Sequence, residues 1–133
     1  MSEYSLAPQK FFNKAHSFAL VGASSAWTDH AYDLFLELEK KNYTVTPMSE
    51  NETLVCGVCA FPEFSNVPEI QHVIFATENE DIALRYLRKM RDSGITQCWF
   101  EEGFSTPEME EFARLNFFEV VKGVNLLENL QKI

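Results

Sequence analysis

One turn of the sequence combines a glycine with small side chains that could approach a phosphate closely. Gly22 ends the apolar run of residues 18–21, and Ala23, Ser24 and Ser25 follow it before a helical pattern begins. Small side chains let backbone N–H groups and the next helix N-terminus come close to a phosphate. Because the further glycines of the fingerprint G-x-G-x-x-G are missing, the turn indicates nucleotide binding without specifying the nucleotide. The two serine hydroxyls could bind phosphate or close the turn by bonding to local backbone.

Residues next to this turn raise the question of hydrolytic chemistry. Asp29 and His30 lie close in sequence to Ser24 and Ser25. A nucleophile elbow requires G-x-S-x-G, which the chain lacks here, and consecutive helical residues point in directions about a hundred degrees apart. Capping of the following helix by Thr28 or Asp29 explains these residues better. We therefore predict no catalytic residues and no enzyme activity, and we keep His30 as a candidate phosphate donor.

A C-x-x-C pair is the other chemically suggestive motif. Cys56 and Cys59 have the spacing of thioredoxin-like redox sites. Such a pair needs a helix N-terminus, whereas residues 60–62, Ala-Phe-Pro, are a poor helix start. A zinc site would need two more ligands, and neither Cys98 nor the three histidines are paired at ligand spacing. The sequence favours two incidental thiols around a turn glycine, with a redox role left open and no metal expected.

Composition narrows the range of partners. The chain has 133 residues and a formal net charge of −9, from 11 Lys plus Arg against 20 Asp plus Glu. That charge is a poor match for nucleic acid or an anionic membrane, and it opposes a polyanionic ligand unless bases cluster at the site. The N-terminus shows no signal peptide, and no apolar run approaches the ~18 residues of a membrane span. Three cysteines then indicate a reducing compartment, so we expect a cytoplasmic protein.

Strand and helix patterns alternate along the chain. The strands and helices that they predict must position the candidate residues around Gly22 and His30. Strand-like runs occupy residues 18–21, 43–46, 70–75, 97–100 and 117–121, with Pro47 expected to end the second. The alternation predicts an α/β fold in which a parallel sheet of about five strands is covered by helices on both faces. We expect one doubly wound Rossmann-like domain over residues 1–133, with an N-terminal extension or helix at residues 1–14.

The predicted helices have recognisable ends and apolar faces. The first has its core face at Ala31, Leu34, Phe35 and Leu38. The clearest helix is capped by Asn79 and ended by Gly94, with acidic residues first and basic residues last. Its expected buried face is Ile82, Ala83, Tyr86, Leu87 and Met90. A capping box at residues 105–108 opens the next helix, and a last helix begins near Leu126.

Several short segments follow one another in an order found in one protein family. The first strand ends in Val21-Gly22-Ala23-Ser24, and the second reads Asn42-Tyr43-Thr44-Val45-Thr46-Pro47. Then come Gly57, the pairs Phe61-Pro62 and Val67-Pro68, and the segment Trp99-Phe100-Glu101-Glu102-Gly103. In this order the chain resembles the small stand-alone CoA-binding proteins related to the CoA-binding domain of succinyl-CoA synthetase. The resemblance covers most of the chain, from Phe12 to Glu128.

The resemblance implies non-catalytic binding of CoA or an acyl-CoA. It places the pyrophosphate over the turn that begins at Gly22 and over the start of the next helix. The adenosine end would lie near the turn after the second strand. The ligand-binding residues expected on this basis are Gly22, Ala23, Ser24, Ser25, His30, Pro47, Met48, Ser49, Ala76, Thr77 and Gly103.

Departures from the family pattern mostly remove positive charge. Residues 48–50 read Met-Ser-Glu where the family has V-N-P, residues 75–77 read Phe-Ala-Thr where it has F-R, and the first helix starts without arginine. Glu101 replaces a glutamine. Each lost arginine removes a charge-assisted phosphate contact, and Glu50 and Glu101 are expected to add repulsion. A second hypothesis is therefore a degenerate member that acts through a protein partner or self-association. A more distant one is an NAD-binding oxidoreductase with Glu50 on the ribose.

Overall fold

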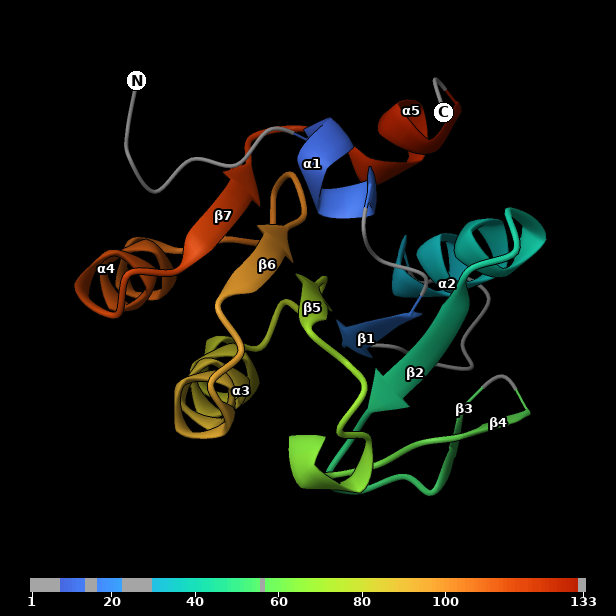
Figure 1. Ribbon diagram of the computed structural model, residues 1–133, viewed down its shortest axis with the longest axis horizontal. Coiled ribbons are helices and arrows are strands. Elements are labelled where there is room, and N and C mark those ends of the chain that lie inside the picture. The colour runs from blue at the N-terminus through green and yellow to red at the C-terminus, as the bar shows by residue number, and fades with distance from the viewer. Residues whose placement is uncertain (1–7, 14–16, 23–29, 56, 132–133) are drawn as a thin grey trace.

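The structure is built on a five-stranded parallel sheet in the order β2-β1-β5-β6-β7 (Figure 1). Its strands are β1 (Ser17–Val21), β2 (Thr44–Met48), β5 (His72–Phe75), β6 (Gln97–Phe100) and β7 (Glu119–Lys122). The computed structural model describes residues 8–13, 17–22, 30–55 and 57–131. Strand order reverses between β1 and β5, and sheets of this type bind ligands beyond the carboxyl ends of the strands at such a point.

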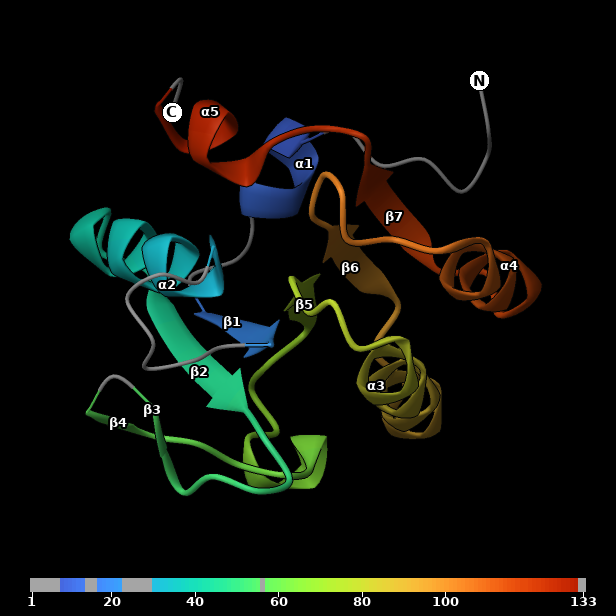
Figure 2. The ribbon, with the colours of Figure 1, turned by 180° about the vertical axis from the view of Figure 1, so that it is seen from behind.

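Helices cover both faces of this sheet, as Figures 1 and 2 show from opposite sides. One face carries α3 (Glu80–Ser93) and α4 (Pro107–Leu115), and the other carries α1 (Pro8–Asn13), α2 (His30–Lys40) and α5 (Leu126–Gln131). Side chains alternate along the strands between two hydrophobic clusters, so that Val73 and Phe75 belong to one and Ile74 to the other. The predicted doubly wound α/β fold is confirmed. Within the described ranges, no helix combines the length and apolar character needed to cross a bilayer.

Aromatic side chains fix α1 on the sheet. Phe11 is fully buried, and its ring stacks on that of Phe18 with 5.4 Å between centroids. The same ring meets the indole of Trp99 edge-on at 5.5 Å. Each aromatic pair adds ~0.5–1.5 kcal/mol beyond the burial of its area. The N-terminal segment therefore belongs to the core, at least over the residues of α1.

Two helices follow their local sequence signals closely. The Asn79 side chain accepts a hydrogen bond from the backbone N–H of Ile82 at the start of α3, and Gly94 ends the helix with a φ of 75°. In α2, the four buried residues are those with helical spacing in the sequence, Ala31, Leu34, Phe35 and Leu38. Caps and apolar periodicity act within a few residues, which explains why both were predictable.

Three predicted details are wrong, and each has a local reason. Pro47 lies inside β2 rather than ending it, because β2 is the edge strand of the five-stranded sheet and tolerates a missing N–H. The cap of α4 is Thr106, which accepts from the N–H of Met109, rather than Ser105. The last strand begins at Glu119, because Phe117 has a φ of 59° and turns the chain before the strand.

A small antiparallel hairpin beyond β2 was not predicted. It pairs β3 (Leu54–Val55) with β4 (Val58–Cys59), and the short helix η1 (Phe64–Asn66) follows. The backbone of Phe61 returns to the sheet edge, where its N–H donates to the carbonyl of Pro47 at 3.1 Å. Strands of two residues carry too little sequence pattern to be recognised.

Gly22 sets the distance between the tips of β1 and β5. Its φ is 101°, and a Cβ at this position would lie 2.5 Å from the carbonyl oxygen of Ala76. The N–H of Ala76 in turn donates to the carbonyl of Val21 at 2.9 Å. The glycine is therefore required by the packing of two backbones at the point where strand order reverses.

Gly22→Ala should lower the free energy of unfolding by about 2–5 kcal/mol, because it adds a left-handed backbone penalty to a steric clash. Gly103→Ala is the matched control, since its φ of 87° is similar and a Cβ added there would meet no atom within 4 Å. We expect that control to lose only about 1 kcal/mol. Urea unfolding of both variants measures the difference, and equal losses would show that the contact with Ala76 is unimportant.

Candidate functional site

Two clefts lie at the carboxyl ends of the strands and meet at Gly22 and Thr77. The larger, which we call the His30 cleft, has a volume of about 510 Å³ and is lined by Gly22, His30, Ala31, Ala76, Thr77, Glu78, Asn79 and Phe104. The smaller, the Tyr86 cleft, has a volume of about 210 Å³ and is lined by Gly22, Met48, Ser49, Glu50, Asn51, Glu52, Thr77, Ile82 and Tyr86. Together they form the candidate site, at the predicted edge of the sheet.

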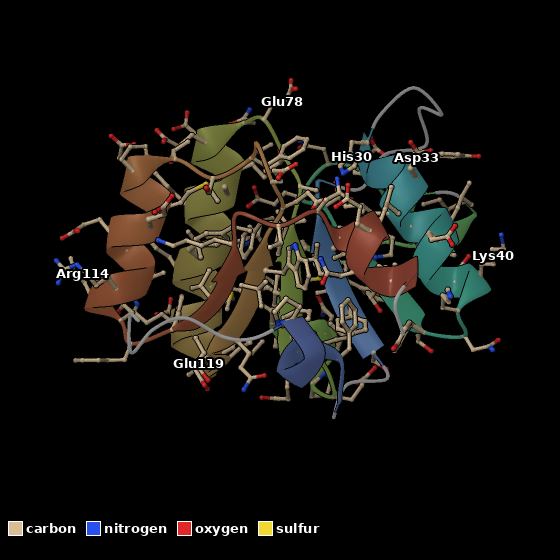
Figure 3. The ribbon with its side chains drawn as sticks, turned by 90° about the horizontal axis from the view of Figure 1, so that it is seen from above. His30, Asp33, Lys40, Glu78, Arg114 and Glu119 are labelled. Atoms are coloured by element: carbon tan, nitrogen blue, oxygen red, sulfur yellow. The ribbon has the colours of Figure 1, made fainter. Side chains whose placement is uncertain are left out.

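The ends of β5 and α3 give this site a fixed floor. The Oγ1 atom of Thr77 accepts from the N–H of Asn79 at 3.2 Å, and the Oδ1 atom of Asn79 accepts from Ile82 at 3.1 Å. The chain therefore passes from strand to helix through a hydrogen-bonded turn. Figure 3 shows His30 and Glu78 at one edge of the molecule and Glu119 at the opposite edge, where β7 begins.

A buried glutamate holds one wall of the His30 cleft. The Glu101 side chain is fully buried, and its Oε2 atom lies 2.5 Å from Nε2 of His30. Its Oε1 atom accepts from Nε1 of Trp99 at 3.2 Å and from the backbone N–H of Leu126 at 2.9 Å. The His30 ring also stacks on Phe104, with 5.7 Å between ring centroids. Glu101 thus ties β6 to the starts of α2 and α5.

This position corrects the expectation that Glu101 repels a ligand at the strand tip. Both of its oxygens are engaged inside the protein, and neither cleft includes it among its lining residues. A buried carboxylate must be paired and hydrogen-bonded to be tolerated, and His30 together with two N–H donors meets that requirement. The chain therefore uses Glu101 to position His30 rather than to contact a ligand.

The described lining of the two clefts is acidic. It contains Glu50, Glu52 and Glu78, and within the described ranges it contains no lysine or arginine. Two cationic side chains of α3 are paired with Glu50. Nε of Arg85 lies 3.2 Å from one oxygen of this carboxylate, and Nζ of Lys89 lies 3.3 Å from the other.

Tyr86 brings a buried polar group to the wall of the smaller cleft. The residue is 1% exposed, and its hydroxyl has no hydrogen-bond partner among the residues that the structure describes. Burial raises the pKa of Tyr86 well above its usual range, and the negative charges of Glu50 and Glu63 raise it further. The hydroxyl therefore stays protonated at neutral pH and can both donate and accept.

The predicted ligand-binding residues fall into four groups. Gly22, His30, Ala76 and Thr77 line the His30 cleft, and Met48 and Ser49 join Gly22 and Thr77 in the Tyr86 cleft. Pro47 is buried in β2 and lines neither cleft, and Gly103 is exposed beside Phe104 without lining either. Ala23, Ser24 and Ser25 lie outside the described residues.

Five of the lining residues were not identified from the sequence, and these are Ala31, Asn51, Glu52, Ile82 and Tyr86. The apolar spacing of α3 assigned Ile82 and Tyr86 to the core, and Tyr86 is indeed buried there. In the strand order, β2 and β5 lie on either side of β1. The carboxyl ends of β2 and β5 therefore lie near each other across the tip of β1, and α3, which follows β5, borders the loop after β2. No local pattern in the sequence specifies that order.

The two described cysteines, Cys59 and Cys98, line neither cleft. Cys59 is exposed in β4, and Cys98 is fully buried in β6, where burial raises the pKa of its thiol far above the usual range. Cys56 lies outside the described residues, so the geometry of the C-x-x-C pair is not described. Among the described residues, no group of three or more His, Cys, Asp or Glu side chains could hold a metal ion.

A doubly wound sheet with a glycine turn and clefts at its switch point defines the class of nucleotide-binding α/β proteins. The sequence matches the model of the CoA binding domain family over residues 16–129, and the chain belongs to this family. The match covers the whole sheet and both clefts. No curated protein matches the chain.

Solved structures with the same fold come from several microorganisms. A conserved hypothetical protein from Pyrococcus furiosus is 20% identical with a TM-score of 0.78, covering 86% of this chain and 98% of that one. A hypothetical protein from Pyrococcus horikoshii OT3 is 19% identical with a TM-score of 0.81, covering 96% and 92%. A protein from Thermus thermophilus is 17% identical with a TM-score of 0.77, covering 96% and 98%. At these identities the likeness shows the fold alone.

Replacing Glu101 tests its role in holding the cleft wall. Glu101→Gln keeps an oxygen that can accept from Trp99 and Leu126, so we expect a loss of about 1–2 kcal/mol in the free energy of unfolding. Glu101→Leu leaves two buried N–H donors and His30 without this partner, and should lose about 3–5 kcal/mol. Urea unfolding distinguishes the two, with the exposed neighbour Glu102→Leu as control. If Glu101→Leu proved as stable as Glu101→Gln, the hydrogen bonds would not be what holds this wall.

Proposed function

We propose that the protein binds CoA or an acyl-CoA without catalysing a reaction. The observation that carries this proposal is the pair of clefts joined at Gly22 and Thr77, in a chain of the CoA binding domain family. A ligand with a nucleotide at one end, a pyrophosphate in the middle and a long arm at the other fits such a paired site. We assign the adenosine to the Tyr86 cleft, the pyrophosphate to the junction at Gly22, and the arm to the His30 cleft.

A binding role without chemistry is supported by the residues that line the clefts. His30 is the one histidine among the described lining residues, and its Nε2 atom is engaged by Glu101. The Ser49 hydroxyl accepts from the N–H groups of Asn51 and Glu52, which is a turn interaction rather than activation by a base. A cytoplasmic setting agrees with the three cysteines of the sequence.

A second candidate function is that of a degenerate member that acts through a partner or through self-association. The observation that favours it is the acidic lining of the clefts. The carboxylates of Glu50, Glu52 and Glu78 repel the phosphates of a nucleotide and so lower its affinity. Binding of NAD for hydride transfer is a more distant alternative. It would require Glu50 to accept from a ribose, although that carboxylate is already paired with Arg85 and Lys89.

Ligand-induced stabilisation separates these functions. The purified protein would be heated at low salt with CoA, acetyl-CoA, NAD, ATP or AMP, each at a concentration near saturation. A ligand at about a hundred times its Kd adds ~2.7 kcal/mol to stability, which raises the Tm by several degrees. We expect a shift with CoA and acetyl-CoA and none with NAD. A folded protein that none of them stabilises would favour the partner hypothesis.

A variant at the junction of the clefts tests the location of the site. Thr77→Glu places a carboxylate between the two clefts, and we expect it to abolish the CoA-dependent shift in Tm while the free protein remains folded. Thr44→Glu, at the exposed amino end of β2, is the matched control and should keep the shift. Gly22 is unsuitable for this purpose because its replacement strains the fold. Equal binding by both threonine variants would place the ligand elsewhere.

A further inference from the structure

We propose that the Tyr86 cleft selects a nucleotide whose ribose hydroxyls are free and rejects a ribose phosphate, so that the protein prefers dephospho-CoA to CoA. This inference rests on the proposed function, because it specifies which CoA-type ligand that site takes. It differs from the expectation raised by family membership alone, in which CoA itself is the ligand.

The charges that line the cleft are the first ground. Glu50 and Glu52 contribute carboxylates, and within the described residues neither Arg85 nor Lys89 lines the cleft. Nζ of Lys89 is surrounded by oxygens, since it contacts Glu50, the carboxylate of Glu63 and, at 3.1 Å, the carbonyl of Pro62. The two cations are thus matched by Glu50 and Glu63, and Glu52 adds a further negative charge at the lining.

The Glu50 carboxylate is held in place but still has room to accept hydrogen bonds. Arg85 contacts its Oε1 atom and Lys89 its Oε2 atom, and the side chain remains 31% exposed. An ionised carboxylate offers about four lone-pair sites, so both oxygens retain capacity after these contacts. A neighbouring pair of ribose hydroxyls can donate to such a carboxylate, as in nucleotide sites where an acidic residue after the second strand binds the ribose.

Tyr86 provides an independent indication of a ligand. Its hydroxyl is buried and unpartnered among the described residues, although buried polar groups are normally hydrogen-bonded. The residue lines the same cleft as Glu50 and Glu52. A ligand hydroxyl can both accept from this group and donate to a carboxylate, which a phosphate cannot do because its oxygens only accept.

A phosphate on the ribose therefore meets the like charges of Glu50 and Glu52, and the side-chain donors among the described lining residues are all neutral. The dianion would replace one of the two hydroxyls that donate to Glu50, and juxtaposed like charges disfavour binding strongly. We expect dephospho-CoA, which differs from CoA only by the missing ribose phosphate, to bind roughly tenfold tighter or more. Because the effect is electrostatic and partly exposed, this preference should shrink as salt rises.

Calorimetric titration of the wild-type protein with CoA and dephospho-CoA measures the preference directly. In Glu50→Gln, we expect CoA to bind tighter than it does to wild type and the ratio of the two Kd values to fall to about threefold or less. Glu69→Gln is the matched control, because it removes one exposed carboxylate at the amino end of β5, far from the clefts, and should leave the ratio unchanged.

The outcomes separate this inference from the function on which it rests. If both ligands bind and CoA binds as tightly as dephospho-CoA, the inference is wrong and CoA binding stands. If the preference exists but survives in Glu50→Gln, the assignment to this carboxylate is wrong. If neither ligand binds the folded wild-type protein, the proposed function fails and the inference fails with it. Dephospho-CoA preference that disappears in Glu50→Gln and persists in Glu69→Gln supports it.

Discussion

The close contact between Gly22 and the backbone of Ala76 is the constraint on which the site depends. The tips of β1 and β5 approach so closely there that no side chain fits between them. Gly22 and Thr77 consequently form the wall that both clefts share. A glycine at this place is usually explained by the approach of a phosphate. In this protein the backbone at the end of β5 leaves no room for a side chain at this position, so glycine is required whether or not a ligand is bound.

Glu101 shows how a buried carboxylate is accommodated where the family resemblance implies a glutamine. A glutamine at this place can satisfy Trp99 and Leu126 without introducing a charge, whereas a glutamate needs a cationic or hydrogen-bonding partner once it is buried. His30 supplies that partner from the start of α2. The contact between Glu101 and His30 therefore links the wall of the larger cleft to the core. It also fixes the orientation of the His30 ring, which lines the candidate site.

The sequence predicted the elements and the edge of the site well, because both follow from short-range patterns. The ends of α3 and the buried face of α2 were readable from caps and spacing, and the strand tips then indicated where a ligand would lie. Long-range features were not readable. The extension of β2 through Pro47 depends on its being an edge strand, the burial of Glu101 depends on His30, and the position of Tyr86 beside the loop after β2 depends on strand order.

The proposed ligand preference rests on how the charged side chains around the Tyr86 cleft pair with one another. Arg85 and Lys89 of α3 bind carboxylates of their own chain, which leaves Glu50 and Glu52 as the charged residues among the described lining of the cleft. A net charge of −9 offers no long-range compensation for this arrangement. Affinity for the proposed nucleotide ligand would therefore come from hydrogen bonds and shape rather than from ion pairs. A ligand gains most at such a site when its hydroxyls, rather than its phosphates, face the acidic wall.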